Sequence, residues 1–378
     1  MTSSMPSLQR QRLQAWAFRG ASKLLGRLQG VLTGVLPPAV RLLQIGSAFW
    51  QSRALAVAAQ LDLATHLGEE RLTHAELAER AGIRPDLCLR LLRFLAAMGV
   101  FSLGADGRVS NNPVSQALRS DRPGSVRHVV LMHNSPEMTQ PWLDALEESL
   151  HTGVVPFEQV HAEPLFAYMD SHPEFDALFA RAMDEVGALS GEAFVTALDW
   201  GRFDRLIDLG GGKGAKSAAI LRGHPGLKAI VMDRAPVIAQ ARRWWQEPER
   251  QLLAARVEFE AGDLLSDALP EARSPQDVYL LSAVLHGCDD SEAATLLGRV
   301  RAAVGRSGAT VVLMEVVMPD HEADLATTGF DMQMLMGTRG RERTAAEWRA
   351  LVRQSGFDWI ETVQMASIGA LLVLRGQP

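Results

Sequence analysis

The chain has few cysteines, the residues from which disulfide frameworks and many structural zinc sites are built. Its 378 residues include two cysteines, Cys88 and Cys288, which lie far apart and form no CxxC pattern. Neither a disulfide scaffold nor a bound metal is therefore expected, and free thiols are typical of a reducing cytoplasm. No apolar run reaches the roughly 18 residues that a membrane-spanning helix needs. The sequence predicts a cytoplasmic protein without integral membrane association.

An excess of positive charge is also missing. The net charge is -6, which argues against a protein that neutralises many phosphates, so nucleic acid is not expected as a partner. Hydrophobic residues make up 47% of the chain, enough to build the cores of two or three domains. The expected partners are a small molecule and a second copy of the chain.

Residues 1–37 form a basic amphipathic extension that ends at Pro37-Pro38. Its charged residues are all basic: Arg10, Arg12, Arg19, Lys23 and Arg27. A segment of this kind can lie on a membrane surface or act as a transit peptide. We favour a simpler interpretation, a helix that packs on a partner subunit.

Residues 38–195 are predicted to form a mainly helical domain that contains a winged helix. Apolar spacing predicts a helix over residues 49–67, Thr73 with Glu76 predicts a capping box, and a helix follows from Pro85 to Gly99. Two short strands around an Asp-Gly turn complete the pattern at residues 100–109. A winged helix serves either DNA binding or dimerisation, so a DNA-binding regulator with a ligand-sensing α/β domain is one hypothesis.

Residues 196–378 alternate apolar strands with helices, which predicts a Rossmann-like doubly wound α/β domain. Its first strand runs into Asp208 and then into a loop that contains Gly210, Gly211, Gly212 and Gly214. Glycines at these positions let a ligand lie against the backbone. The loop lacks the third glycine of the dinucleotide fingerprint, and a glycine loop alone also occurs in tight turns without a ligand.

Two further acids end the next two predicted strands. Asp233 lies about 20 residues beyond the loop, where a carboxylate that binds ribose hydroxyls belongs. Asp263 follows the third strand and is placed to accept a hydrogen bond from the exocyclic amine of adenine. Each acid is also compatible with a turn residue, but three acidic strand ends together favour a nucleoside-containing ligand.

The combined motifs resemble the S-adenosylmethionine-dependent O-methyltransferases of the plant caffeic-acid type and of bacterial natural-product pathways. The matching segments are residues 208–214, 262–263, 281–290, 314–319 and 340–344, and the resemblance spans residues 40–375. It implies that the winged helix serves dimerisation in a homodimer and that the cofactor is S-adenosyl-L-methionine, which becomes S-adenosyl-L-homocysteine. The cofactor-binding positions that it implies are Asp208, Gly210, Gly212, Asp233, Asp263, Leu264 and Ser282.

His286 follows an apolar strand and is the candidate general base. The carboxyl ends of strands are where ligands bind in open α/β sheets, and an imidazole is suited to removing a hydroxyl proton near neutral pH. A lone histidine at such a place is more often a hydrogen-bonded loop residue. The resemblance assigns it the role of base and assigns to Glu315 and Glu342 the orientation of its ring. Without the resemblance, Glu342 would be interpreted as a loop acid that is solvated or salt-bridged near Arg341 and Arg343.

The same resemblance implies an acceptor pocket lined by His133, Phe179, Met183, Asp331 and Met334. Methionines adapt to flat apolar ligands, which favours a hydroxylated aromatic or polyketide-like natural product. Gly287 and Cys288 replace the acidic and aromatic residues usual in the family, which indicates a roomier pocket. Methylation at carbon, or an enzyme of the same fold that transfers no methyl group, remains the alternative.

Overall fold

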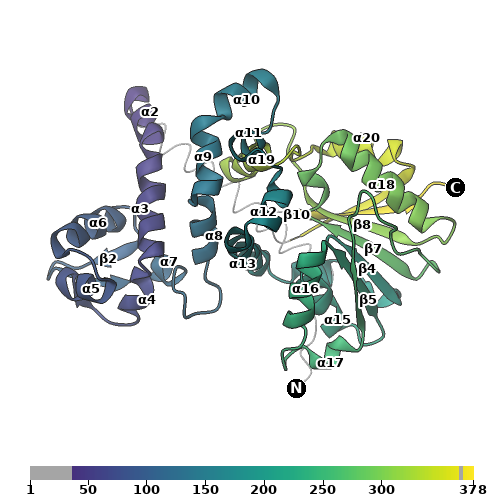
Figure 1. The fold of residues 1–378 in the computed structure, drawn as a ribbon, viewed down its shortest axis with the longest axis horizontal. Helices are drawn as coiled ribbons and strands as arrows, with labels where there is room; N and C mark the ends of the chain where they lie inside the picture. The colour runs from purple at the N-terminus through teal and green to yellow at the C-terminus, as the bar shows by residue number, and fades with distance from the viewer. Residues whose placement is uncertain (1–35, 366–368) are drawn as a thin grey trace. The chain divides into compact units, whose positions relative to one another are not determined.

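The structure, a computed structural model, describes residues 36–365 and 369–378, so most of the predicted N-terminal extension lies outside the described residues. The described chain divides into two compact units, which meet in sequence between residues 190 and 191. Residues 36–190 are mainly helical, and residues 191–378 contain the large sheet (Figure 1). We call them the N-terminal unit and the C-terminal unit.

The N-terminal unit begins with two helices, α2 (Pro38–Gly46) and α3 (Ala48–Gln60). The prediction of one continuous helix over residues 49–67 is wrong, because α4 (Leu63–Leu67) is separate. Asp62 lies between them with φ 49°, a left-handed conformation that aspartate tolerates. Its carboxylate accepts a hydrogen bond from Thr65 Oγ1 at 2.7 Å. The break turns Leu63 and Leu67 into the core, where both are fully buried.

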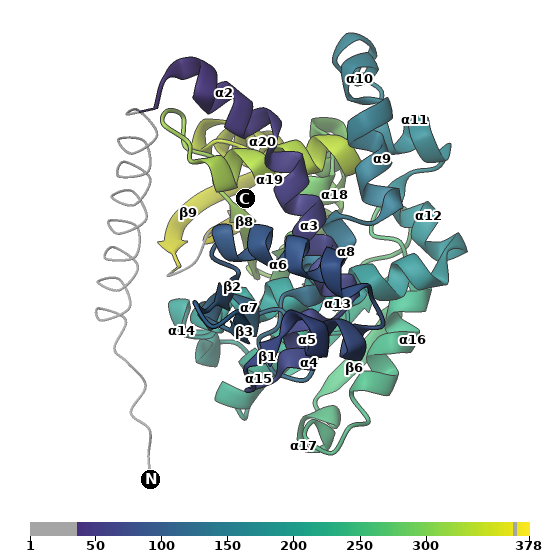
Figure 2. The same ribbon diagram turned by 90° about the vertical axis from the view of Figure 1, so that its left-hand side faces the viewer.

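Two helices and a small sheet follow. The predicted capping box is confirmed: Glu76 N donates to Thr73 Oγ1 at the start of α5 (His74–Ala81), and Thr73 N donates back to Glu76 Oε2. The predicted helix after it is α6 (Pro85–Ala97), and the hairpin is β2 (Phe101–Leu103) with β3 (Arg108–Asn111). A short strand that the sequence did not predict, β1 (Leu72–Thr73), makes the sheet three-stranded in the order β1-β3-β2. Figure 2 shows α4, α5 and α6 gathered around it.

The rest of the N-terminal unit is helical, as predicted. Its helices are α7 (Pro113–Gln116), α8 (Arg127–His133), α9 (Pro136–Asp144), α10 (Leu146–Thr152), α11 (Pro156–His161), α12 (Leu165–Ser171) and α13 (Pro173–Ser190). Met132, Met138 and Phe175 are buried together in the core of these helices.

The C-terminal unit is built on a seven-stranded sheet of the predicted doubly wound type. Its order is β6-β5-β4-β7-β8-β10-β9, parallel except where β10 pairs with its neighbours. The strands are β4 (Arg205–Leu209), β5 (Lys228–Asp233), β6 (Val257–Ala261), β7 (Asp277–Ser282), β8 (Thr310–Val316), β9 (Phe357–Gln364) and β10 (Gly369–Gly376).

Helices cover both faces of this sheet (Figure 1). One face buries apolar side chains against α14 (Ala193–Ala197), η1 (Trp200–Arg202), α15 (Ala215–Gly223) and α17 (Gln251–Ala254). The other face packs against α18 (Asp290–Val304) and α20 (Ala345–Gln354). The remaining helices are α16 (Ala235–Trp244), η2 (Leu285–Gly287) and α19 (Leu325–Gly337).

The five parallel strands β4 to β8 end at one edge of the sheet. The glycine loop follows β4, Asp233 ends β5, Asp263 follows β6, His286 follows β7, and Glu315 lies at the end of β8. These residues share one end of the sheet because the strands are parallel. Each crossover connection returns the chain to the opposite end, where the next strand begins.

Candidate active site

The glycine loop has a backbone that other residues adopt only with strain. Gly210, Gly212 and Gly214 have φ values of 68°, 60° and 78°. A Cβ at Gly210 would lie 2.7 Å from Val284 Cγ2, and one at Gly211 would lie 2.7 Å from Asp208 Cγ. The sequence therefore needs glycine here for both conformation and space. The backbone amides of Gly210, Gly212 and Gly214 donate to Met232 O, Asp233 Oδ2 and Gly211 O, which fixes the path of the loop.

A buried carboxylate, Asp208, and a partly buried one, Asp233, support this loop. Asp208 Oδ2 accepts from Ser217 Oγ at 2.6 Å, whereas its buried Oδ1 has no hydrogen-bond partner. Burial raises the pKa of Asp208 to about 6, against the opposing effect of the Ser217 bond. Asp233 accepts from Gly212 N at 2.8 Å and from Arg234 N at 2.7 Å, and burial raises its pKa despite these bonds. Asp233 thus connects the end of β5 to the glycine loop.

The other positions predicted to bind the cofactor lie along the same edge. Asp263 is exposed, and its Oδ1 accepts from Leu265 N at 2.8 Å. Leu264 packs against the sheet core, and its carbonyl accepts from Arg299 Nε at 3.0 Å. Ser282 is the buried last residue of β7. The edge therefore carries every cofactor-binding position that the sequence suggested.

His286 and Glu342 form a hydrogen-bonded pair at this edge. Their Nδ1 and Oε1 atoms are 2.8 Å apart, Glu342 is buried, and the histidine side chain keeps 13% exposure. Burial alone would lower the pKa of His286, but the Glu342 hydrogen bond and the charges of Glu315 and Glu342 raise it above its ordinary value. Because the carboxylate accepts at Nδ1, that nitrogen bears hydrogen and Nε2 is left as the basic nitrogen.

Glu315 is held in a different way from Glu342. Its Oε1 accepts from Val284 N at 3.1 Å and from Leu285 N at 3.0 Å, so it fixes the backbone that leads into His286. The preceding residue, Ala283, has φ 54°, a conformation that costs energy for a residue with a side chain. Burial raises the pKa of Glu315. Glu315 therefore affects His286 in two ways. Its charge raises the pKa of the imidazole, and its hydrogen bonds position the backbone that carries the ring.

A loop after α19 locks the pair in place, and its role was not apparent in the sequence. Arg343 is fully buried and donates to the carbonyls of Leu285 and Cys288, both at 2.8 Å, and to Asp290 Oδ1 at 2.9 Å. The backbone of Gly340 touches η2 so closely that a Cβ there would lie 1.8 Å from the carbonyl oxygen of His286. The sequence signal for these contacts was the Gly-Arg-Glu-Arg-Thr motif at residues 340–344.

Asp331 also belongs to this support. Its Oδ1 accepts from Glu342 N at 2.8 Å, so it orients the carboxylate that contacts His286. The alternative that pairs Glu342 with an arginine is wrong, since Arg341 and Arg343 both bind Asp290. On the same helix, Met334 is partly buried, and the ring of Phe330 lies 5.6 Å from the imidazole, centroid to centroid.

The other predicted acceptor residues, His133, Phe179 and Met183, belong to the N-terminal unit. His133 ends α8 and is exposed, while Phe179 and Met183 lie one helical turn apart on α13. Their contact with an acceptor stays a prediction.

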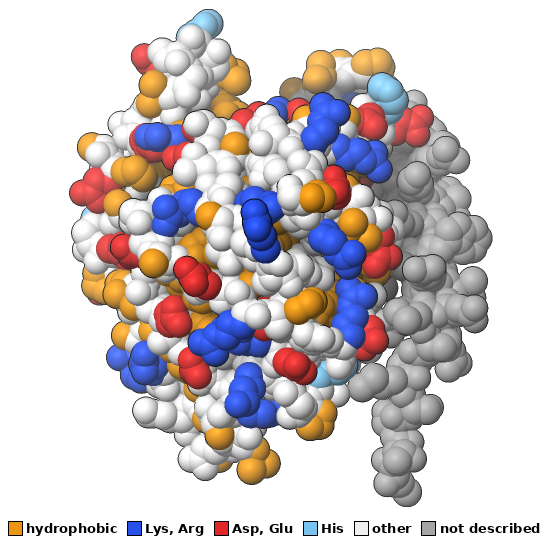
Figure 3. Space-filling view, turned by 90° about the vertical axis from the view of Figure 1, so that its right-hand side faces the viewer, with side chains coloured by type: hydrophobic (Ala, Val, Ile, Leu, Met, Phe, Trp, Pro, Cys, Tyr) orange, Lys and Arg blue, Asp and Glu red, His pale blue; other side chains and the backbone are white. Residues whose placement is uncertain are grey.

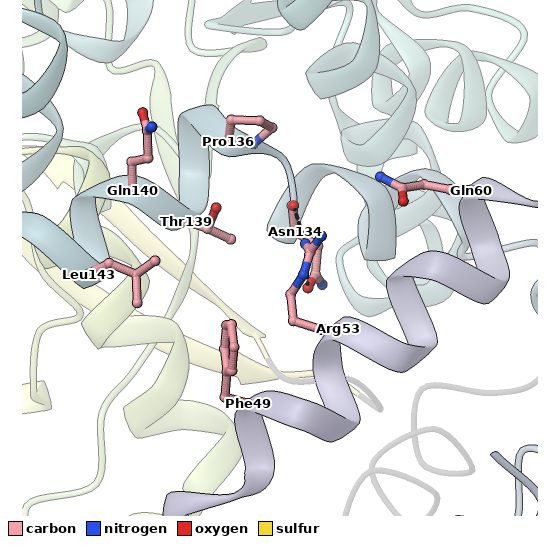
Figure 4. A pocket seen from close by; sticks show the side chains of 8 residues that line it. All are labelled: Phe49, Arg53, Gln60, Asn134, Pro136, Thr139, Gln140 and Leu143. Carbon is pink, nitrogen blue, oxygen red and sulfur yellow. Dashed lines mark hydrogen bonds between the residues drawn. The ribbon is translucent and has the colours of Figure 1, made fainter. Parts of the chain in front are cut away.

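The N-terminal unit also contains an open hollow of about 310 Å³ between α3 and α9, into which Phe49, Arg53 and Leu143 project (Figure 4). Arg53 Nη1 donates there to the carbonyl of Asn134 at 2.8 Å. The hollow contains none of the predicted cofactor or base residues, all of which lie in the C-terminal unit.

Two family models match the chain. One describes an O-methyltransferase domain and matches residues 142–358; the other describes the O-methyltransferase dimerisation domain and matches residues 43–121. The chain belongs to this O-methyltransferase family. A phenazine O-methyltransferase of Lysobacter antibioticus is 32% identical to it over 345 residues, which are 91% of this chain and 98% of that protein. An 8-amino-8-demethylriboflavin N,N-dimethyltransferase of Streptomyces davaonensis is 31% identical, over 89% and 95% of the two chains.

Solved structures agree with this O-methyltransferase assignment. The crystal structure of LaPhzM has a TM-score of 0.81 and 30% identity, covering 90% of this chain and all of that one. CalO1, a methyltransferase in calicheamicin biosynthesis solved with S-adenosylhomocysteine bound, has a TM-score of 0.76 and 29% identity over 89% and 97% of the two chains. The chain is therefore an S-adenosylmethionine-dependent methyltransferase of natural-product biosynthesis.

The matches also bear on the partners of this O-methyltransferase. The dimerisation domain indicates a homodimer, and α2 and α3 expose Leu42, Leu43 and Trp50. The face shown in Figure 3 intersperses acidic and basic side chains. Among the described residues, each helix is too short or too polar to cross a membrane.

Proposed function

We propose that this protein methylates a hydroxyl group of a small aromatic or polyketide-like natural product, with His286 as the general base. In this proposal residues 38–195 serve dimerisation and cover the acceptor, and residues 196–378 bind the cofactor. The observation that carries the proposal is the His286–Glu342 pair at the sheet edge that also bears the glycine loop.

The cofactor site rests on the glycine loop at that edge. The loop has no room for a Cβ at Gly210 beside Val284 or at Gly211 beside Asp208, so its backbone packs closely on the sheet, and Asp208 Oδ1 is a buried acceptor without a hydrogen-bond partner. We assign the ribose to Asp233, the adenine to Asp263 and the remaining cofactor contacts to the glycine loop, Leu264 and Ser282. When bound, S-adenosylmethionine supplies an electrophilic methyl group on a positively charged sulfur.

The residues around His286 prepare the acceptor for attack. The acceptor hydroxyl would hydrogen-bond to His286 Nε2, which would take its proton. Glu342 holds the Nδ1 hydrogen and stabilises the imidazolium that results, while Glu315 and Arg343 keep the backbone of η2 in place. The transferred proton stays on the imidazole until solvent removes it.

A general base distinguishes a hydroxyl acceptor from an amine. A neutral aromatic amine already presents a lone pair, whereas a phenol becomes a strong nucleophile only as its proton leaves. We therefore expect labelled methyl from S-adenosylmethionine to appear on hydroxylated phenazines, naphthoates or anthraquinones and not on the matched amino compounds. Incubation of each pair with the enzyme, followed by mass spectrometry, checks this. Transfer to the amines alone would contradict the proposal.

The raised pKa of His286 has a consequence for the pH profile. A base must be neutral to accept a proton, so kcat/KM should rise with pH through a midpoint above the ordinary histidine value of about 6.5. Glu342→Gln removes the charge that raises the pKa while keeping a hydrogen-bond acceptor at Nδ1. We expect its midpoint to move to lower pH and its plateau rate to fall by about one to two orders of magnitude. An unchanged midpoint would show that a group other than His286 controls the fall of kcat/KM at low pH.

A further inference from the structure

A tryptophan at the end of α16 contacts the glycine loop from behind. Trp245 is 2% exposed, and its indole Nε1 donates to the backbone carbonyl of Lys213 at 2.8 Å. A Cβ at the next residue, Gly214, would lie 3.2 Å from that same nitrogen. The indole therefore packs against the backbone at the point where the loop turns into α15.

The ring of Trp245 is itself held on two sides. It packs edge-to-face against Phe259 of β6, with centroids 5.7 Å apart, and against Trp244 at 5.8 Å. Because the Trp245 ring is buried and packs against Phe259 and Trp244, its orientation is fixed, and its N–H points at the carbonyl of Lys213. The neighbouring Trp244 differs in its contacts: its face lies 4.9 Å from Lys213 Nζ and 3.7 Å from the guanidinium carbon of Arg250.

The glycine loop needs such restraints. A segment with glycines at 210, 211, 212 and 214 has many conformations available, and fixing one of them costs conformational entropy. Two side chains oppose this freedom at consecutive residues: Asp233 accepts from Gly212 N, and Trp245 donates to the carbonyl of Lys213. Both belong to the continuous stretch from the end of β5 to the end of α16.

We infer that Trp245 is a positioning residue for the cofactor, because its indole N–H holds the glycine loop in the conformation that receives S-adenosylmethionine. The inference rests on the proposed placement of the cofactor at this loop. A ligand that binds one conformation of a mobile loop loses apparent affinity in proportion to the time that the loop spends elsewhere. Trp245 therefore raises cofactor affinity without touching the cofactor.

The test removes one hydrogen-bond donor, the indole N–H of Trp245. Trp245→Phe keeps a buried aromatic ring and removes the N–H. The matched control is Trp359→Phe, which removes an indole N–H that donates to Thr362 Oγ1 on β9. By calorimetric titration we expect Trp245→Phe to bind S-adenosylhomocysteine about fivefold more weakly and the control to bind it like the wild type. In turnover, the KM for S-adenosylmethionine should rise, with kcat and the acceptor KM unchanged. A change in kcat alone would overturn the inference.

Two additions keep the test decisive. If Trp245→Phe does not fold, benzothienylalanine at position 245 supplies a ring of the same shape with sulfur in place of N–H, and the same weakening is expected. In protein labelled with 5-fluorotryptophan, the fluorine NMR signal of Trp245 is identified by its absence from the spectrum of Trp245→Phe. This signal should shift when S-adenosylhomocysteine binds.

Asp233→Asn separates the inference from the proposed site. Normal binding by Trp245→Phe alongside weakened binding by Asp233→Asn would overturn the inference and leave the cofactor site standing. Normal binding by both variants would overturn the cofactor site and the inference with it.

Discussion

His286→Ala is expected to lower kcat by about two to four orders of magnitude, because the acceptor hydroxyl then has no positioned base. Cofactor affinity should be preserved, since His286 lies on η2 after β7, whereas the glycine loop and Asp233 follow β4 and β5. Single-turnover transfer of labelled methyl measures the first quantity, and calorimetric titration of S-adenosylhomocysteine measures the second.

His321→Ala is the matched control for this variant. His321 is an exposed histidine of the same unit, so its removal should change neither rate nor affinity. The assignment of the base would be contradicted if His286→Ala turned over at the wild-type rate. Loss of cofactor binding in His286→Ala would point to a structural role for the side chain.

Asp233→Asn is expected to weaken S-adenosylhomocysteine binding by about ten- to a hundredfold, the size of a lost charge-assisted hydrogen bond or two. The change alters the hydrogen bond to Gly212 N and removes the charge proposed to bind the ribose. Glu258→Gln, an exposed acid on β6, is the control that should bind normally.

A cofactor analogue separates the two roles of Asp233. If its carboxylate binds the ribose, the wild type should discriminate against the 2′-deoxy analogue of S-adenosylhomocysteine, and Asp233→Asn should not. Equal discrimination by both proteins would assign Asp233 to the loop backbone alone and contradict the proposed ribose contact.

Much of this account could be predicted from local sequence, because strand ends and glycine loops have strong local signatures. The alternation of strands and helices, the loop after Asp208, and the position of His286 after an apolar strand follow from pattern and from the rule that ligands bind at the carboxyl ends of parallel strands. The capping box at Thr73 is equally local, since it involves residues three apart.

The supports of the site depend on contacts between distant segments and have no local signature. Arg343 reaches the carbonyl of Leu285 across 58 positions of the chain, and a buried arginine in a charged motif resembles a solvated one. Asp331 was expected to contact the acceptor, and the structure shows it bound to Glu342 N. The break at Asp62 was missed for a similar reason, because burial of Leu63 overrides a continuous helical pattern.

The role of His286 is tested most directly by the dependence of kcat/KM on the acidity of the acceptor hydroxyl. A series of phenolic acceptors of one shape but graded pKa would be methylated by the wild type and by His286→Ala at one pH. The account predicts a shallow dependence for the wild type, and a steep one for the variant, which should recover on acceptors already ionised in solution. Equal slopes for the two proteins would show that His286 does not remove the proton.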